Sequence, residues 1–283
     1  MSTHHSAIID VGGGYRAVYG AGVLDRLMDL GIQIDHCYGV SAGSANMSSY
    51  LSGQSGRCYR FYMEYSTRRE YASPSNFVKG RNFANLDYIY GTLSNHDGEY
   101  PLDYESLKAN PAQFTVVATD ANDGSARYFT KDDLSQDHYE PLMASSAVPV
   151  ANQPYAIDGI PYFDGGMADP IPLRKAFEDG ADRVIVILTR QRDFMRSPKP
   201  DSLPARILSR TYPKAAERLE HRYETYNREL KEAYQYEKEG SLLLLAPDEL
   251  CGLNTLTRNA EGLDRMYRKG YANAAAIPAF LAS

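Results

Sequence analysis

The stretch Cys37-Tyr38-Gly39-Val40-Ser41-Ala42-Gly43 joins a short apolar run to a series of small residues. The run Cys37–Val40 is typical of a buried strand, and the small side chains of Ser41–Leu51 suit a helix packed closely on a sheet. Gly39 and Gly43 flank Ser41 in the pattern G-x-S-x-G. In that pattern the glycines make room for a sharp strand-to-helix turn that presents a serine hydroxyl above the sheet. Ser41 is therefore a candidate nucleophile in an α/β protein.

A second glycine run, Gly12-Gly13-Gly14, lies upstream and directly follows the apolar run Ala7–Val11. Successive backbone N–H groups at the start of a helix form a pocket for negative charge, which the helix dipole reinforces. Arg16 adds a charged donor two residues later. Acyl transfer needs such donors for its oxyanion. We therefore expect Gly12, Gly13, Gly14 and Arg16 to form an oxyanion hole.

A serine hydroxyl needs a base to take its proton. Asp164 is the best candidate, because the apolar pair Tyr162-Phe163 delivers its carboxylate to a turn made by Gly165 and Gly166. An aspartate with an ordinary pKa of about 3.9 is ionised at neutral pH and can accept a proton. The other interpretation of this segment is a glycine-rich turn whose aspartate caps a helix. His36, which precedes the elbow, is expected to be a strand or loop residue.

Strand-like runs alternate with helical patterns along the chain. The runs are Ala7–Val11, Cys37–Val40, Phe114–Thr119, Arg127–Thr130, Val184–Thr189 and Leu242–Ala246. The helical patterns are Val18–Leu30, Ser41–Leu51, Pro170–Gly180, Ala205–Glu239 and Leu256–Ala276. This alternation predicts a three-layer α/β/α fold around a central, mostly parallel sheet. Residues 55–110 show no clear strand, and the proline-rich residues 191–204 are expected to form an exposed loop.

Composition limits the function further. The 283 residues carry a net charge of −6, which argues against a nucleic-acid binder. It leaves transient contact with a membrane surface open, because one patch of an acidic protein can be basic or apolar. Three widely spaced cysteines favour a reducing compartment over a disulfide framework or a zinc site. Neither a signal peptide nor a run of about 18 apolar residues is evident, so a cytoplasmic location is expected.

The ordered set GGGYR, GVSAG and DGG resembles the signatures of the patatin-like phospholipase family. The resemblance covers about residues 6–190 and implies an α/β lipid acyl hydrolase with a Ser–Asp dyad and no catalytic histidine. It makes Ser41 the nucleophile, Asp164 the base and the glycine triplet with Arg16 the oxyanion loop, without a metal or cofactor. It also implies a lipid or small acyl ester as substrate, through an acyl-enzyme intermediate. One departure is Ala17, where the family usually has glycine.

The chain divides into an expected catalytic core over 6–190 and a C-terminal extension over 191–283. The extension is expected to be mostly helical with one strand, packed on the same domain. The sequence indicates no oligomeric state.

Three other functions remain as alternatives. A histidine-dependent α/β-hydrolase would use Asp164 and then His221, but several strands would precede its elbow. A dinucleotide-binding fold would use Gly12-x-Gly14-x-x-Ala17 with Asp35 about 20 residues on, leaving the elbow and the DGG turn unexplained. A non-catalytic lipid-binding protein would contain the candidate nucleophile, base and oxyanion loop without using them for catalysis.

Overall fold

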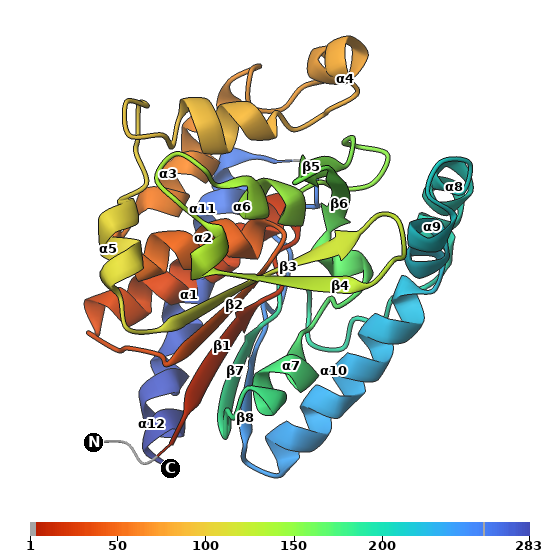
Figure 1. The fold of residues 1–283 in the computed structure, drawn as a ribbon. Helices are drawn as coiled ribbons and strands as arrows, with labels where there is room; N and C mark the ends of the chain where they lie inside the picture. The colour runs from red at the N-terminus through yellow and green to blue at the C-terminus, as the bar shows by residue number, and fades with distance from the viewer. Residues whose placement is uncertain (1–3, 257) are drawn as a thin grey trace.

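The computed structural model describes residues 4–256 and 258–283. Its middle layer is a sheet of eight strands among these residues, in the order β5-β6-β3-β2-β1-β7-β8, with β4 beside β3 (Figure 1). The strands are β1 (Ser6–Asp10), β2 (His36–Val40), β3 (Gln113–Asp120), β4 (Ala126–Thr130), β5 (Tyr155–Ile157), β6 (Ile160–Asp164), β7 (Arg183–Ile187) and β8 (Leu242–Leu245). The strands expected from the sequence are all present.

Helices cover both faces of this sheet. One face carries α1 (Val18–Asp29), α2 (Ala42–Leu51), α3 (Arg57–Met63), α5 (Tyr104–Ala109), α6 (Glu140–Ser145) and α11 (Ala260–Asn273), as Figure 1 shows. The other face carries α7 (Leu173–Glu178) and α10 (Arg222–Lys238), with α8 (Lys199–Leu208) and α9 (Pro213–Glu220) at its edge. The short helices α4 (Pro74–Gly80) and α12 (Ile277–Ala282) lie at the periphery. The predicted three-layer α/β/α fold is confirmed.

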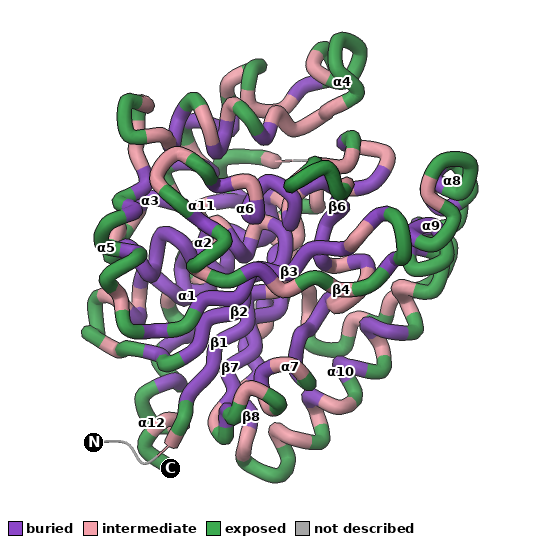
Figure 2. The backbone as a smooth tube through the Cα atoms, in the orientation of Figure 1, coloured by how far each residue is buried: buried purple, intermediate pink, exposed green. Residues whose placement is uncertain are grey.

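The core follows from the alternation of side chains along the strands. On β1, Ile8 packs into the cluster shared with α1 and α2, whereas Ala7 and Ile9 pack against α7 and α10. Figure 2 shows the result as a continuous buried layer through the middle of the molecule. The central strands are buried on both faces, as expected of parallel strands covered by helices.

The direction of the strands brings the two candidate catalytic residues together. β2 pairs in parallel with β3, with Val40 opposite Val117, while β6 pairs antiparallel with β3, with Ala118 opposite Asp164. Ser41 follows Val40 and therefore comes level with Ala118 and Asp164. The two residues lie two strand spacings apart, about 10 Å between backbones, which their side chains can bridge.

Several boundaries differ from the sequence-based expectations. β5 and β6 were not predicted as strands. Pro161 is unusual within a strand, and the apolar run before Asp164 is too short to indicate one. The single helix expected over 205–239 is three helices, α8, α9 and α10, because Pro213 starts a new helix and the backbone turns again at His221. α8 begins at Lys199, inside the segment expected to be a loop. The helix expected from Leu256 begins at Ala260, and Thr257 lies outside the described residues.

The C-terminal part of the chain shares the sheet and the helical layer. β8 pairs in parallel with β7. α11 crosses α1 at two glycines: a Cβ on Gly22 would lie 2.1 Å from the Tyr267 carbonyl oxygen, and one on Gly270 would lie 2.0 Å from that of Tyr19. Only glycine allows so close an approach. The division of the chain near residue 190 stays a prediction. Over the described ranges, no helix is both long and apolar enough to cross a membrane.

Candidate active site

Ser41 occupies a strained turn between β2 and α2. Its backbone angles are φ 57° and ψ −134°, a combination that L-residues rarely adopt. A Cβ on Gly39 would lie 2.4 Å from the Ser44 Cα, and one on Gly43 would lie 2.2 Å from the Asp10 carbonyl oxygen. The glycines of the motif are therefore required by close packing. The Ser41 N–H donates to the Ser145 hydroxyl at 2.8 Å, which holds the turn.

The glycine loop packs directly on this turn. Gly12, Gly13 and Gly14 all have positive φ, and a Cβ on Gly12 would lie 2.2 Å from the Val40 carbonyl oxygen. The Gly12 N–H donates to the Asp10 carboxylate at 2.9 Å, so it is committed within the protein. Among the described residues, no hydrogen-bond acceptor pairs with the N–H groups of Gly13 and Gly14. These two groups are free to bind an oxyanion.

Arg16 packs against the loop. It is 3% exposed, and its Nη1 donates to the Thr255 hydroxyl at 2.9 Å. A Cβ on Gly13 would lie 2.9 Å from Arg16 Nη2, so the guanidinium lies directly against this glycine. Thr255 also accepts the Tyr15 N–H through its carbonyl at 3.3 Å. The C-terminal segment therefore supports the glycine loop, a contact that no motif in the sequence signals.

Asp164 ends β6 beside this loop and is 6% exposed. Its Oδ1 accepts the Gly166 N–H at 2.8 Å, and its carbonyl accepts the Thr119 hydroxyl at 2.9 Å. Burial raises the pKa of its carboxyl, while a hydrogen bond from the Ser41 side chain acts in the opposite direction. A Cβ on Gly165 would lie 2.1 Å from the Val117 carbonyl oxygen, which explains the first glycine of the turn.

Asp10 is a fully buried carboxylate that the sequence analysis did not single out. Besides the Gly12 N–H, it accepts the Asn46 amide at 2.8 Å, and that amide also donates to the Ala17 carbonyl at 2.8 Å. Burial raises the pKa of Asp10 to about 6. One side chain thus links β1, the glycine loop, α1 and α2. The sequence did contain a sign of this role, because Asp10 is a charged residue at the end of the mostly apolar strand β1.

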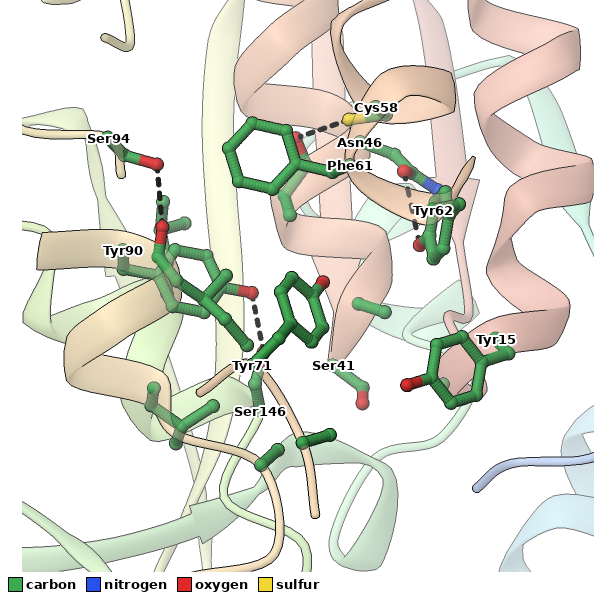
Figure 3. A pocket seen from close by; sticks show the side chains of 18 of the residues that line it. Tyr15, Ser41, Asn46, Cys58, Phe61, Tyr62, Tyr71, Tyr90, Ser94 and Ser146 are labelled. Carbon is green, nitrogen blue, oxygen red and sulfur yellow. Dashed lines mark hydrogen bonds between the residues drawn. The ribbon is translucent and has the colours of Figure 1, made fainter. Parts of the chain in front are cut away.

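An apolar cavity of about 130 Å³ opens beside Ser41. Figure 3 shows the Ser41 side chain at its edge, between the rings of Tyr15 and Tyr71. Much of the wall comes from residues 57–102, within the segment 55–110 in which the sequence shows no clear strand. The aromatic and aliphatic lining comprises Tyr15, Phe61, Tyr62, Tyr71, Leu86, Ile89, Tyr90, Leu102, Tyr139 and Leu142.

The residues required by the alternative enzyme classes lie elsewhere. His221 is exposed at the junction of α9 and α10, where it contacts Glu224 at 3.2 Å. His36 is buried within β2 and bonds to Thr115 at 2.8 Å, so it is the strand residue expected. Asp35 precedes β2 and bonds to Ser6, at the opposite edge of the sheet from the glycine loop. Over residues 4–256 and 258–283, no cluster of three metal-ligating side chains occurs.

Comparison with known proteins places this geometry in a family. The family model described as patatin-like phospholipase matches residues 11–177. The chain belongs to the patatin-like phospholipase family. That match confirms the resemblance seen in the sequence and supports lipid acyl hydrolysis as the activity of the family. A second model, a domain of unknown function (DUF6363), matches residues 212–279.

An individual relative and a solved structure add detail. The chain is 31% identical over 198 residues to the uncharacterized protein YjjU of Escherichia coli K12, covering 68% of this chain and 54% of that protein. The chain thus spans about half the length of that curated relative. The crystal structure of VipD from Legionella pneumophila aligns over 98% of this chain and 67% of its own, with a TM-score of 0.49 and 13% identity.

We expect Asp10→Asn to destabilise the protein in a pH-dependent way. The folded state keeps the Asp10 proton up to about pH 6, whereas the unfolded chain releases it near 3.8. Wild-type stability therefore falls as pH rises through this window, and the variant lacks that change. The difference in free energy of unfolding should be roughly 2 kcal/mol larger at pH 4 than at pH 7. Urea titrations at both pH values, with exposed Asp97→Asn as control, measure it; an unchanged difference would contradict the role.

Proposed function

We propose that the protein is a serine acyl-ester hydrolase in which Ser41 is the nucleophile and Asp164 the base. The observation that carries this proposal is the register that brings the strained serine level with a buried carboxylate. The Ser41 side chain also lowers the pKa of the Asp164 carboxyl, as expected of a hydroxyl close to its base, and this supports the proposal. The chemistry is that of a Ser–Asp dyad in a lipid acyl hydrolase of phospholipase A or lysophospholipase type.

The proposed reaction has two halves. The Ser41 hydroxyl attacks the ester carbonyl while Asp164 accepts its proton, and the free N–H groups of Gly13 and Gly14 bind the oxyanion. Collapse of the intermediate releases the alcohol, which takes the proton from Asp164, and leaves an acyl-serine. Water then gives a proton to Asp164 and attacks the acyl group. Collapse of this second intermediate releases the acid, and the Ser41 oxygen takes the proton back from Asp164. In such sites the loss of one oxyanion donor costs roughly 10²–10³ in kcat.

The cavity beside Ser41 is the proposed site for the acyl group. Its aromatic and aliphatic wall suits a hydrocarbon chain. A volume of about 130 Å³ is close to the roughly 150 Å³ that accommodates benzene in an apolar cavity. A short acyl group fits inside, and a longer chain has to extend through the opening. The exposed side chain of Leu256 borders that opening.

We also propose that α4 contacts a lipid surface. Phe77 is 40% and Val78 is 84% exposed on this helix, which protrudes at the top of Figure 1. Residues 71–82 contain Lys79 and Arg81 but no acidic residue, in a chain of net charge −6. Exposed apolar side chains flanked by cations suit an anionic membrane surface. The segment leads directly to Ala72 and Ala84, which line the cavity.

Replacing either member of the dyad should remove most of the activity. We expect Ser41→Ala and Asp164→Asn each to lower kcat/KM for a chromogenic short-chain ester by roughly a thousandfold or more. Because the two side chains act as a unit, the double variant should be little worse than either single one. Exposed Ser202→Ala and Asp158→Asn serve as matched controls with wild-type rates. Multiplicative losses in the double variant would argue against the dyad.

The fall of kcat/KM at low pH, the acid limb of the pH profile, should reflect protonation of the Asp164 carboxylate. The base works only when ionised, and burial raises its pKa, so kcat/KM should fall with decreasing pH at values above those of an ordinary aspartate. The charge of Arg222 lowers this pKa. We therefore expect Arg222→Gln to move the limb to higher pH.

The same profile tests the histidine alternative. His221→Gln should leave the acid limb and the rate in place, because His221 has no contact with either catalytic residue. A loss of activity in that variant would instead favour a histidine-dependent enzyme.

Contact with lipid should depend on α4. We expect Val78→Asp to reduce sedimentation with phosphatidylglycerol vesicles roughly tenfold, since burial of a valine side chain contributes about 1.5 kcal/mol or more. Leu203→Asp, at a leucine 65% exposed on α8, is the matched control. Equal binding by wild type and both variants would exclude α4 as the contact.

A further inference from the structure

Four arginines gather on the side of the glycine loop that faces α10. Arg16 follows the loop, Arg190 and Arg196 lie in the segment after β7, and Arg222 begins α10. Their charges act on one another: Arg190 and Arg196 on Arg16, and Arg222 on both Arg190 and Arg196. They come from three separate segments of the sequence, so no sequence motif predicts the cluster.

Protein carboxylates neutralise only part of this charge. Asp201 accepts Arg222 Nη2 at 2.5 Å and Nε at 3.0 Å, and it lies 4.0 Å from Arg196. Within the described part of the chain, Arg16 and Arg190 form no ion pair within 4.0 Å, so the Asp201 carboxylate pairs with only two of the four guanidinium groups. The nearby Asp164 carboxylate is the proposed base and has no ion pair within that distance either.

Several hydrogen-bond donors of the arginine cluster have no acceptor among the described residues. Over residues 4–256 and 258–283, no acceptor pairs with the side chains of Arg190 and Arg196, and Arg16 donates only to Thr255. The Nε atoms of all three are buried without a partner. Native proteins leave few buried donors unpaired, and each such group calls for an explanation. Arg190 is partly exposed, and the Arg196 side chain is 24% exposed, so solvent reaches part of each side chain.

Aromatic rings fix the two accessible guanidinium groups in place. Arg190 lies 4.1 Å from the centroid of Phe194, and Arg196 lies 5.1 Å from that of Tyr226. The two rings contact each other edge-to-face at 6.2 Å. Asn227 holds the backbone of Arg196 through two hydrogen bonds, at 2.8 and 3.0 Å. A stacked guanidinium keeps its planar edge free for the bidentate binding of an oxyanion.

The accumulated charge itself favours an anion. Burial, followed by the charges of Arg190 and Arg196, lowers the pKa of Arg16 to about 9. Burial and the charge of Arg222 lower that of Arg196 to about 10. Arg16 and Arg196 therefore stay charged at neutral pH, and repulsion between positive charges in a partly desolvated site is unfavourable until a counter-charge arrives.

We propose that Arg190 and Arg196, backed by Arg16, bind a phosphate group next to the active site. The position suits an ester that carries its own phosphate. Arg16 packs against Gly13, and Thr189, the residue before Arg190, donates a hydrogen bond to the Gly12 carbonyl, so the phosphate would lie beside the proposed oxyanion loop. A glycerol phosphate ester places the two groups only a few bonds apart. The phosphate site stands on its own geometry, while its use for substrate selection rests on the proposed hydrolase function.

The first measurement needs no catalysis. Inorganic phosphate is titrated into Ser41→Ala protein and into the same protein with Arg190→Gln or Arg196→Gln, with binding followed by calorimetry and by Tm. We expect each arginine replacement to weaken binding roughly ten- to hundredfold, the usual effect of losing a hydrogen bond to a charged group. Exposed Arg206→Gln on α8 is the matched control. Each replacement relieves repulsion, so Tm without phosphate should be unchanged or higher, which shows that the variants fold.

The second measurement distinguishes the source of the phosphate. The ratio of kcat/KM for a 1-acylglycerol 3-phosphate to that for the monoacylglycerol with the same chain is compared between wild type and each variant. A roughly tenfold or greater fall in this ratio, together with weaker phosphate binding, supports a site for the substrate's own phosphate.

The remaining outcomes are equally decisive. Weaker phosphate binding with an unchanged ratio supports a site for a separate phosphate-bearing molecule, as does weaker binding in a protein that hydrolyses no ester at all. Phosphate binding that is absent, or equal in all variants, together with an unchanged ratio, overturns the proposal.

Discussion

The carboxylate of Asp10 holds together the parts from which the rest of the site is built. It receives the Gly12 N–H and the Asn46 amide, so it fixes the glycine loop to α2 and, through Asn46, to α1. Its own carbonyl oxygen comes so close to Gly43 that no other residue fits there. A buried carboxylate is unfavourable unless its partners are well placed. That requirement constrains the position of the glycine loop relative to the elbow.

The direction of β6 is the second constraint. Parallel strands alone bring their carboxyl ends to one edge of a sheet, as β1, β2 and β7 do here. Asp164 reaches the same level from the opposite direction, because β6 runs antiparallel to β3. The carboxylate therefore meets Ser41 across the central strand. Burial at that point limits the access of water to both residues.

Sequence alone predicted the layers, the six strands with clear apolar runs and the positions of Ser41, the glycine triplet and Asp164. These features depend on local patterns of glycine, apolar and polar residues. β5 and β6 escaped because the hairpin is short and contains Pro161, so its pairing is a tertiary effect. Ser145, Thr255 and the arginines beyond Arg16 also escaped, since contacts across more than a hundred residues leave no spacing to recognise. Gly12 was expected to donate to an oxyanion, but its N–H is committed to Asp10.

Thr255 has a consequence for how the protein is made. It receives a hydrogen bond from Arg16, its carbonyl oxygen accepts the Tyr15 N–H, and a Cβ on Gly14 would lie 2.1 Å from that oxygen. The ribosome releases the chain from its N-terminus, and segments fold in that order as they emerge. The elbow and the glycine triplet are thus synthesised more than two hundred residues before the segment that braces them. A nascent chain that already contains all three motifs still lacks the support of its glycine loop, so the site is completed only after residue 255 has been synthesised.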